Sequence, residues 1–218
     1  STLDALIGEE LLEQSNPTVG LAAHHGVIDI RITAKAANEA AAVEMLHETE
    51  MRLMQRVGQH IFGADTDELE AVLLNLLKEK HLTLSVIEAG IKDAVIEKLQ
   101  DKDEAGDLHM RFRQFEDPNA AASDYGFEYQ NGLRSVAEAI ARQTLEDAAV
   151  DATIVILSLP DVDESEDIAE ATAVVVATQD DMKSRIYGFG ARNDLTSSWV
   201  SRWSMAYVWR TLKDSTDG

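Results

Sequence analysis

Residues 82–99 contain, in order, a strand, a tight turn and a helix, and the larger half of the chain can be arranged around them. Residues 82–87 have the β-branched content and length of a buried strand. Gly90 ends this run, and apolar residues then recur at spacings of three and four, which predicts a helix over residues 91–99. In α/β proteins such a turn often binds an anion or carries a nucleophile. Here residues 88–93 offer no hydroxyl or thiol, and Asp93 would repel an anion.

The flanking patterns predict a small α+β unit followed by a layered α/β unit. Before residue 64 we expect a helix over residues 3–12, a β-hairpin over 18–34 that turns at His24, His25 and Gly26, a helix over 38–59 and a short strand at 61–63. After residue 64 we expect helices at 68–80 (capped by 65–67), 133–145 and 194–212, and strands at 108–115, 152–159, 171–178 and 183–189. Residues 116–131 are expected to form a loop with at most a helical turn over its alanines. Three strands separated by helices, then a hairpin and a closing helix, indicate an α/β fold.

Composition disfavours several classes of protein. Nineteen basic and forty acidic residues give a formal net charge of −21, which repels nucleic-acid backbones and anionic lipid. The chain has no cysteine, so thiol catalysis and disulfides are excluded. No apolar run approaches the roughly 20 residues that span a bilayer, and no signal-peptide pattern is present. We therefore expect a cytoplasmic protein without nucleic-acid or membrane partners.

Two groups of short motifs resemble a known family. Residues 14–19 (QSNPTV), 30–36 (IRITAKA) and 61–63 (IFG) resemble the KH-type middle segment of the competence- and damage-inducible CinA proteins. Residues 76–88 (LLKEKHLTLSVIE) resemble the start of their C-terminal domain, whose members are nicotinamide-nucleotide amidohydrolases. The resemblance implies a KH-type α+β domain over residues 1–64 and a layered α/β/α CinA C-terminal-like domain with a mixed sheet over 65–218. It also implies that an intact parent protein carries a nucleotide-processing domain before this chain.

The motifs of the amidohydrolase family are largely lost here. The family sequence Glu-Ser-Cys-Thr-Gly-Gly, whose serine is the nucleophile, corresponds to Glu88, Ala89, Gly90, Ile91, Lys92 and Asp93. Residues 113–118 (RQFEDP) replace a segment with a tyrosine and a lysine that assist proton transfer. Residues 158–163, which begin with Ser158, replace a glycine-rich loop and bring two carboxylates. These changes argue against a phosphate-bearing ligand, and the fold can be inherited without the chemistry.

Other candidate sites have simpler explanations. Ser85 lies within a strand and is expected to be a buried core hydroxyl. His24 and His25 lack acidic ligands, His47 lacks the second histidine of a zinc motif, and the acidic residues 161–170 lack the pattern of a calcium loop, so we expect no metal site. Trp199, Trp203 and Tyr207 recur every four residues, which core packing explains best, with a subunit interface as the alternative.

The sequence leaves two functional hypotheses. The favoured one is a catalytically inactive CinA-like fragment, a pseudoenzyme with a structural role as a homodimer and without a cofactor. Its degenerate pocket would comprise Glu88, Ala89, Gly90, Ile91, Lys92, Asp93 and Ser158. The alternative is an active nicotinamide mononucleotide deamidase that uses displaced residues.

Overall fold

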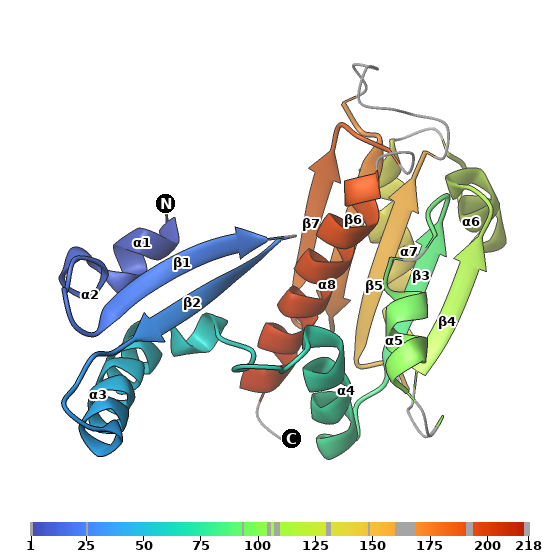
Figure 1. The fold of residues 1–218 in the computed structure, drawn as a ribbon. Helices are drawn as coiled ribbons and strands as arrows, with labels where there is room; N and C mark the ends of the chain where they lie inside the picture. The colour runs from blue at the N-terminus through green and yellow to red at the C-terminus, as the bar shows by residue number, and fades with distance from the viewer. Residues whose placement is uncertain are drawn as a thin grey trace. The chain divides into compact units, whose positions relative to one another are not determined.

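The computed structural model of the chain describes residues 2–24, 26–92, 94–103, 106, 110–129, 132–147, 149–159, 169–190 and 194–215. Its elements form two compact units, Ser1–Asp65 and Thr66–Gly218 (Figure 1). Among the described residues, no helix combines the length and the apolar character that a membrane crossing requires.

The first unit is a β-hairpin with helices on one face. Its elements are α1 (Thr2–Ile7), α2 (Glu9–Leu12), β1 (Thr18–His24), β2 (Val27–Thr33), α3 (Glu39–Val57) and the 3-10 helix η1 (Gly58–His60). β1 and β2 pair antiparallel from Thr18 opposite Thr33 to His24 opposite Val27, which confirms the predicted hairpin. His25, in the predicted turn, lies outside the described residues.

Asn38 caps α3 by accepting a hydrogen bond from the Ala41 N–H at 2.9 Å, because a short polar side chain satisfies a free helix N–H.

Two predicted elements of this unit are wrong. The helix expected over residues 3–12 is interrupted at Gly8, whose φ of +85° is accessible to glycine and ends α1. Residues 61–63 form no strand, because the hairpin is a two-stranded sheet and no described strand pairs with them. Ile61 instead packs against the small core, whose buried members are Ile7, Leu11, Val19, Leu53 and Val57.

The second unit contains a five-stranded mixed sheet. Its strands are β3 (Leu84–Ala89), β4 (Met110–Phe115), β5 (Ala152–Ser158), β6 (Thr172–Thr178) and β7 (Met182–Tyr187), in the order β4-β3-β5-β6-β7. β3 is parallel to both β4 and β5, whereas the β5–β6 and β6–β7 pairs are antiparallel. β5 is buried throughout, as is typical of a strand covered on both faces. The predicted mixed sheet is thus confirmed.

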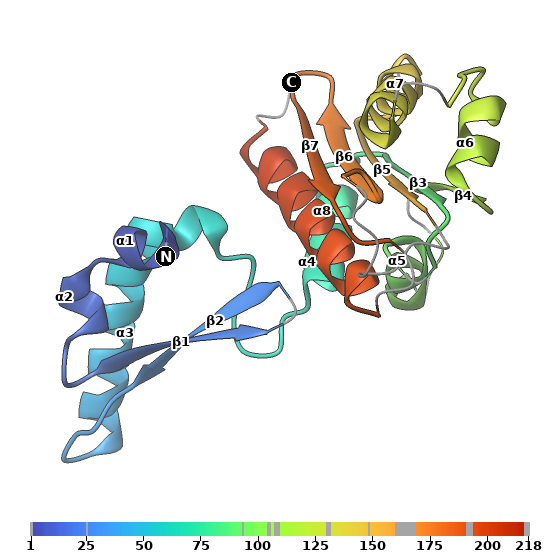
Figure 2. The ribbon, with the colours of Figure 1, turned by 90° about the horizontal axis from the view of Figure 1, so that it is seen from above.

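Helices cover both faces of this sheet. They are α4 (Leu69–Glu79), α5 (Ile96–Lys102), α6 (Pro118–Asp124), α7 (Leu133–Leu145) and α8 (Asp194–Asp214). α4, α5 and α8 lie on one side of the sheet, and α6 and α7 lie on the other (Figure 2). Successive residues of a strand point to opposite faces, so Ala89 packs toward α6 and α7, whereas Glu88 points toward α5. This arrangement confirms the predicted α/β/α layering.

Three predictions for this unit need correction. α5 begins at Ile96 rather than at residue 91, because the chain first crosses the end of the sheet in an irregular segment. Residues 118–124 form the helix α6, which Asp117 caps by accepting a hydrogen bond from the Ala120 N–H at 2.8 Å. Trp199, Trp203 and Tyr207 of α8 were expected in the core, but Trp199 is 46% exposed and Trp203 stacks on Tyr207 at a partly exposed side of the helix. The buried aromatic residue of α8 is Trp209.

Candidate functional site

The carboxyl ends of β3 and β4 form a crevice at the edge of the sheet. The chain leaves β3 toward α5 on one face and leaves β4 toward α6 on the other. Two adjacent parallel strands whose connections diverge leave a gap at their carboxyl ends, and α/β proteins commonly bind ligands in such a gap. The topology therefore places a candidate site beside the turn that follows β3.

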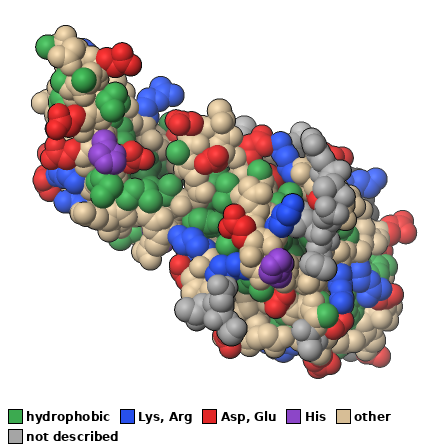
Figure 3. Space-filling model, turned by 90° about the horizontal axis from the view of Figure 1, so that it is seen from below, with side chains coloured by type: hydrophobic (Ala, Val, Ile, Leu, Met, Phe, Trp, Pro, Cys, Tyr) green, Lys and Arg blue, Asp and Glu red, His purple; other side chains and the backbone are tan. Residues whose placement is uncertain are grey.

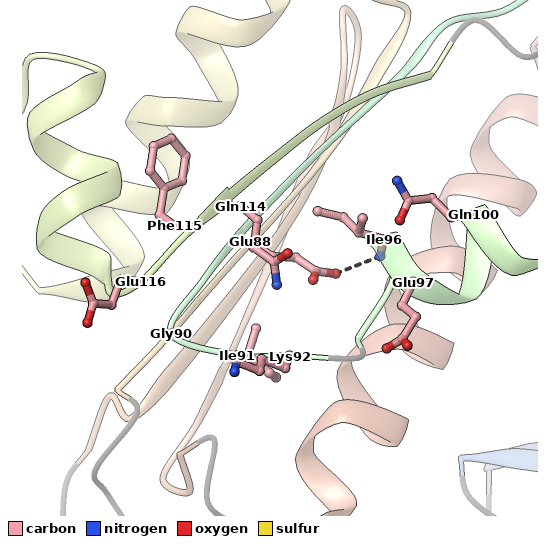
Figure 4. Close-up of a pocket in the computed structure, with 10 residues that line it drawn as sticks. All are labelled: Glu88, Gly90, Ile91, Lys92, Ile96, Glu97, Gln100, Gln114, Phe115 and Glu116. Carbon is pink, nitrogen blue, oxygen red and sulfur yellow. Dashed lines mark hydrogen bonds between the residues drawn. The ribbon is translucent and has the colours of Figure 1, made fainter. Parts of the chain in front are cut away.

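A cavity of about 660 Å³ occupies this position. Of the residues that sequence analysis assigned to the pocket, Glu88, Gly90, Ile91 and Lys92 line it (Figure 4). Sequence analysis did not assign its other lining residues, which are Ile96, Glu97, Gln100, Gln114, Phe115 and Glu116. Two signals pointed to the last three. They lie at the end of the second predicted strand, where a parallel neighbour of β3 reaches the same edge, and residues 113–118 stand where the resembled family has its tyrosine and lysine segment.

Glu88 holds the start of α5 against the end of β3. Its side chain is 1% exposed, and its Oε1 accepts hydrogen bonds from the N–H groups of Val95 at 2.5 Å and Ile96 at 3.0 Å. Figure 4 shows the carboxylate directed at Ile96. A free N–H at a helix start is the group that an anionic ligand would use. Because Glu88 occupies two of these N–H donors, the cavity has fewer hydrogen-bond donors for an anionic ligand than its place in the fold suggests.

Gly90 brings the turn against the end of β5. Its φ is +69°, and a Cβ at this position would lie 2.0 Å from the carbonyl oxygen of Ser158. Only a residue without a Cβ permits this approach. Gly90 thus fixes the path of the chain from β3 into the loop that lines the cavity.

Ala89 and Ser158 do not line the cavity. Ala89 is fully buried and packs in the core cluster that includes Ala121 and Ala122 on the opposite face of the sheet. Ser158 is also fully buried, 2.7 Å from the hydroxyl of Thr172. Since Thr172 donates its only hydroxyl proton to the carbonyl of Phe189, Ser158 must donate to Thr172. Asp93, the remaining predicted position, lies outside the described residues.

The chemistry that the cavity wall can supply is limited. Among the described residues that line it are carboxylates, two amides and the amine of Lys92, but no hydroxyl, thiol or imidazole. In the described part of the chain, no three His, Cys, Asp or Glu side chains come together in a way that could hold a metal ion. The wall therefore suits binding through charge and hydrogen bonds better than nucleophilic attack.

A second cluster of charged groups is structural. Glu138 on α7 accepts a hydrogen bond from Arg134 at 3.0 Å and one from Ser184 of β7 at 2.9 Å. Partial burial raises the pKa of Glu138, but these hydrogen bonds and the nearby Arg142 outweigh it and leave the pKa below its ordinary value. The cluster ties α7 to the edge strand and lies outside the cavity lining.

Comparisons with known proteins agree on one family. Residues 1–63 match the CinA KH domain, described as the KH domain of damage-inducible protein CinA. A competence-damage inducible protein of Caldicellulosiruptor bescii is 32% identical over 111 residues, which are 51% of this chain and 27% of that protein. A CinA-like protein of Dictyoglomus turgidum is 28% identical over 163 residues, 70% of this chain and 40% of that protein. The chain thus spans less than half the length of these curated relatives.

A solved structure extends the likeness to the fold. The crystal structure of a competence-damaged protein (CinA) superfamily protein from Escherichia coli matches with a TM-score of 0.53, over 71% of this chain and 98% of that chain. The two sequences are 16% identical, so this match concerns the fold alone.

Proposed function

We propose that this chain, which belongs to the CinA family, has kept the family's fold but not an amidohydrolase activity, and that it serves a structural role in a larger assembly. One observation carries this proposal: the cavity at the ends of β3 and β4 has no hydroxyl or thiol among its described lining residues, and Ala89, at the position of the family's serine, points away from it. The proposal is tested by measuring ammonia released from nicotinamide mononucleotide.

The alternative, a deamidase with displaced residues, would have to use Lys92 or a carboxylate, and no contact of the described residues favours either.

Restoring the serine alone is expected to restore no activity. In the Ala89→Ser variant the new hydroxyl would enter the apolar cluster around Ala121 and Ala122 rather than the cavity. Burying an unpaired hydroxyl there should also cost about 1–3 kcal/mol of stability. We expect ammonia release from nicotinamide mononucleotide to stay at the level of an Ala120→Ser control, which places the same change at an exposed position. Turnover by Ala89→Ser alone would mean that the ancestral pocket survives and lacks only its nucleophile.

The first unit is proposed not to bind nucleic acid despite its KH fold. KH domains clamp the nucleic-acid backbone with a G-x-x-G loop, which residues 1–81 do not contain, and these residues carry six basic and fourteen acidic side chains. On the face drawn in Figure 3, basic side chains stand in small groups separated by acidic, apolar and other side chains. We expect no gel shift of single-stranded RNA or DNA by micromolar protein at physiological salt. A shift under those conditions would contradict this part of the proposal.

The structural role is proposed to involve self-association. Leu195 and Trp199 on α8 are 50% and 46% exposed, which is a large apolar exposure for two neighbouring helical residues. We expect light scattering to give a molar mass twice the 23.9 kDa of one chain. A mass of 23.9 kDa that is independent of concentration would contradict it.

A further inference from the structure

The charge of the groups that line the cavity between the ends of β3 and β4 is opposite to what an anionic ligand requires. Three carboxylates line it, those of Glu88, Glu97 and Glu116, against one ammonium, that of Lys92. Glu88 also occupies the N–H groups at the start of α5 that would otherwise attract an anion. In a chain of net charge −21, the surrounding field adds to this preference for cations.

The lining also distinguishes organic cations from metal ions. No described cluster of three His, Cys, Asp or Glu side chains could hold a metal, so the carboxylates of the wall do not converge on one point. Two amides are interspersed with them: Gln114 lies beside Glu88 on the paired strands, and Gln100 follows Glu97 by one turn of α5 (Figure 4). Spread carboxylates and amide oxygens suit a ligand with several N–H donors.

The cavity has the size of a small-molecule site, and its wall is more polar than that of most such sites. Its volume of about 660 Å³ falls in the range of ligand pockets, roughly 300–1,000 Å³. The buried side chains of Ile91 and Ile96 supply apolar wall, while Glu97, Gln100 and Gln114 are exposed and reach solvent. An elongated ligand could therefore place its carbon chain on the isoleucines and its charged end on the carboxylates.

We propose that this cavity binds a small organic cation, an amine or a guanidine with an aliphatic chain. This inference rests on the proposed function in one respect. If the cavity has lost its catalytic activity, it can bind such a ligand without converting it. The site would then report on, or be stabilised by, a cationic metabolite.

The test is an NMR titration of the full chain with agmatine, a guanidine with an amine at the far end, and in parallel with inorganic phosphate, both at 150 mM salt. We expect agmatine to shift backbone amide signals of residues 88–100 and 114–116 in a saturable manner, and phosphate to leave them unchanged. Glu97→Gln and Glu116→Gln should each weaken agmatine binding about two- to fivefold, the range for exposed ion pairs. Glu79→Gln removes the same charge from an exposed position on α4 and should leave the affinity unchanged.

Several results would overturn the proposal. Agmatine shifts that spread over the acidic surface without saturating, or that weaken equally in Glu79→Gln, would indicate general attraction to a negative protein. Saturable binding of phosphate at these residues would show that the cavity takes anions. Ammonia release from nicotinamide mononucleotide would instead overturn the proposed function, so the two failures are distinguishable.

Discussion

Replacing Gly90 with alanine is expected to destabilise the second unit by about 3 kcal/mol or more. Part of this cost is a left-handed backbone at a residue with a Cβ, about 1–2 kcal/mol, and part is the overlap of that Cβ with the Ser158 carbonyl oxygen at 2.0 Å. That oxygen is backbone at the end of a buried strand, so it cannot move without disturbing the sheet. Urea unfolding followed by tryptophan fluorescence measures this effect, because all three tryptophans lie in α8 of the second unit.

A matched variant separates the two costs. Gly126 has a φ of +75°, similar to that of Gly90, but a Cβ there would have no atom within 4 Å. Gly126→Ala should therefore lose only the backbone part, about 1–2 kcal/mol. If Gly90→Ala lost no more stability than Gly126→Ala, the close contact between the turn and the end of β5 would be wrong.

Replacing Glu88 with alanine is expected to cost about 2–4 kcal/mol. The change removes the acceptor of the Val95 and Ile96 N–H groups, and both residues are buried, so water cannot replace the lost hydrogen bonds without opening the site. A buried donor left without a partner costs about 1–3 kcal/mol. The same urea experiment measures the loss.

Two further variants define the cause of this loss. Glu88→Gln keeps an acceptor oxygen and should recover more than half of the lost stability. Asp117→Ala removes a carboxylate cap from the exposed start of α6 and should cost only about 1 kcal/mol. Equal losses for Glu88→Ala and Asp117→Ala would mean that Glu88 is not a buried structural link.

The sequence patterns predicted the second unit well where local and tertiary preferences agree. The strand β5 and the helix α7 lie within one residue of their expected bounds. A strand buried on both faces leaves a continuous apolar run in the sequence, and a helix buried on one face leaves apolar residues at spacings of three and four, so the two patterns are easily told apart. The spacing of Ile91 and its neighbours predicted a helix five residues too early. Ile91, Ala94 and Val95 are buried because the chain crosses the end of the sheet there. Buried residues in an irregular segment can have the same spacing as the apolar face of a helix.

The candidate site could be located from the sequence but not assembled. Glu88 and Gly90 were assigned to the turn, yet the sequence does not show that β3 continues through Ala89, which places that side chain on the face covered by α6 and α7. Gln114 lies in β4 and Glu116 directly follows it, about 25 residues from the turn, and the parallel pairing of β3 and β4 brings them to the turn. The exposed position of Trp199 was likewise missed, because an aromatic stripe alone does not show which face of α8 meets the sheet.

The proposed loss of amidohydrolase activity is tested most directly by the ammonia released from nicotinamide mononucleotide when the chain and the compound are mixed at equal concentrations. Under those conditions even one turnover per chain would be measurable. We expect no more ammonia than with the chain unfolded by heat, because no described residue of the cavity can act as a hydroxyl or thiol nucleophile. Release at a rate proportional to the concentration of folded chain would contradict this, and the cavity would then be an active site built from residues other than those of the family.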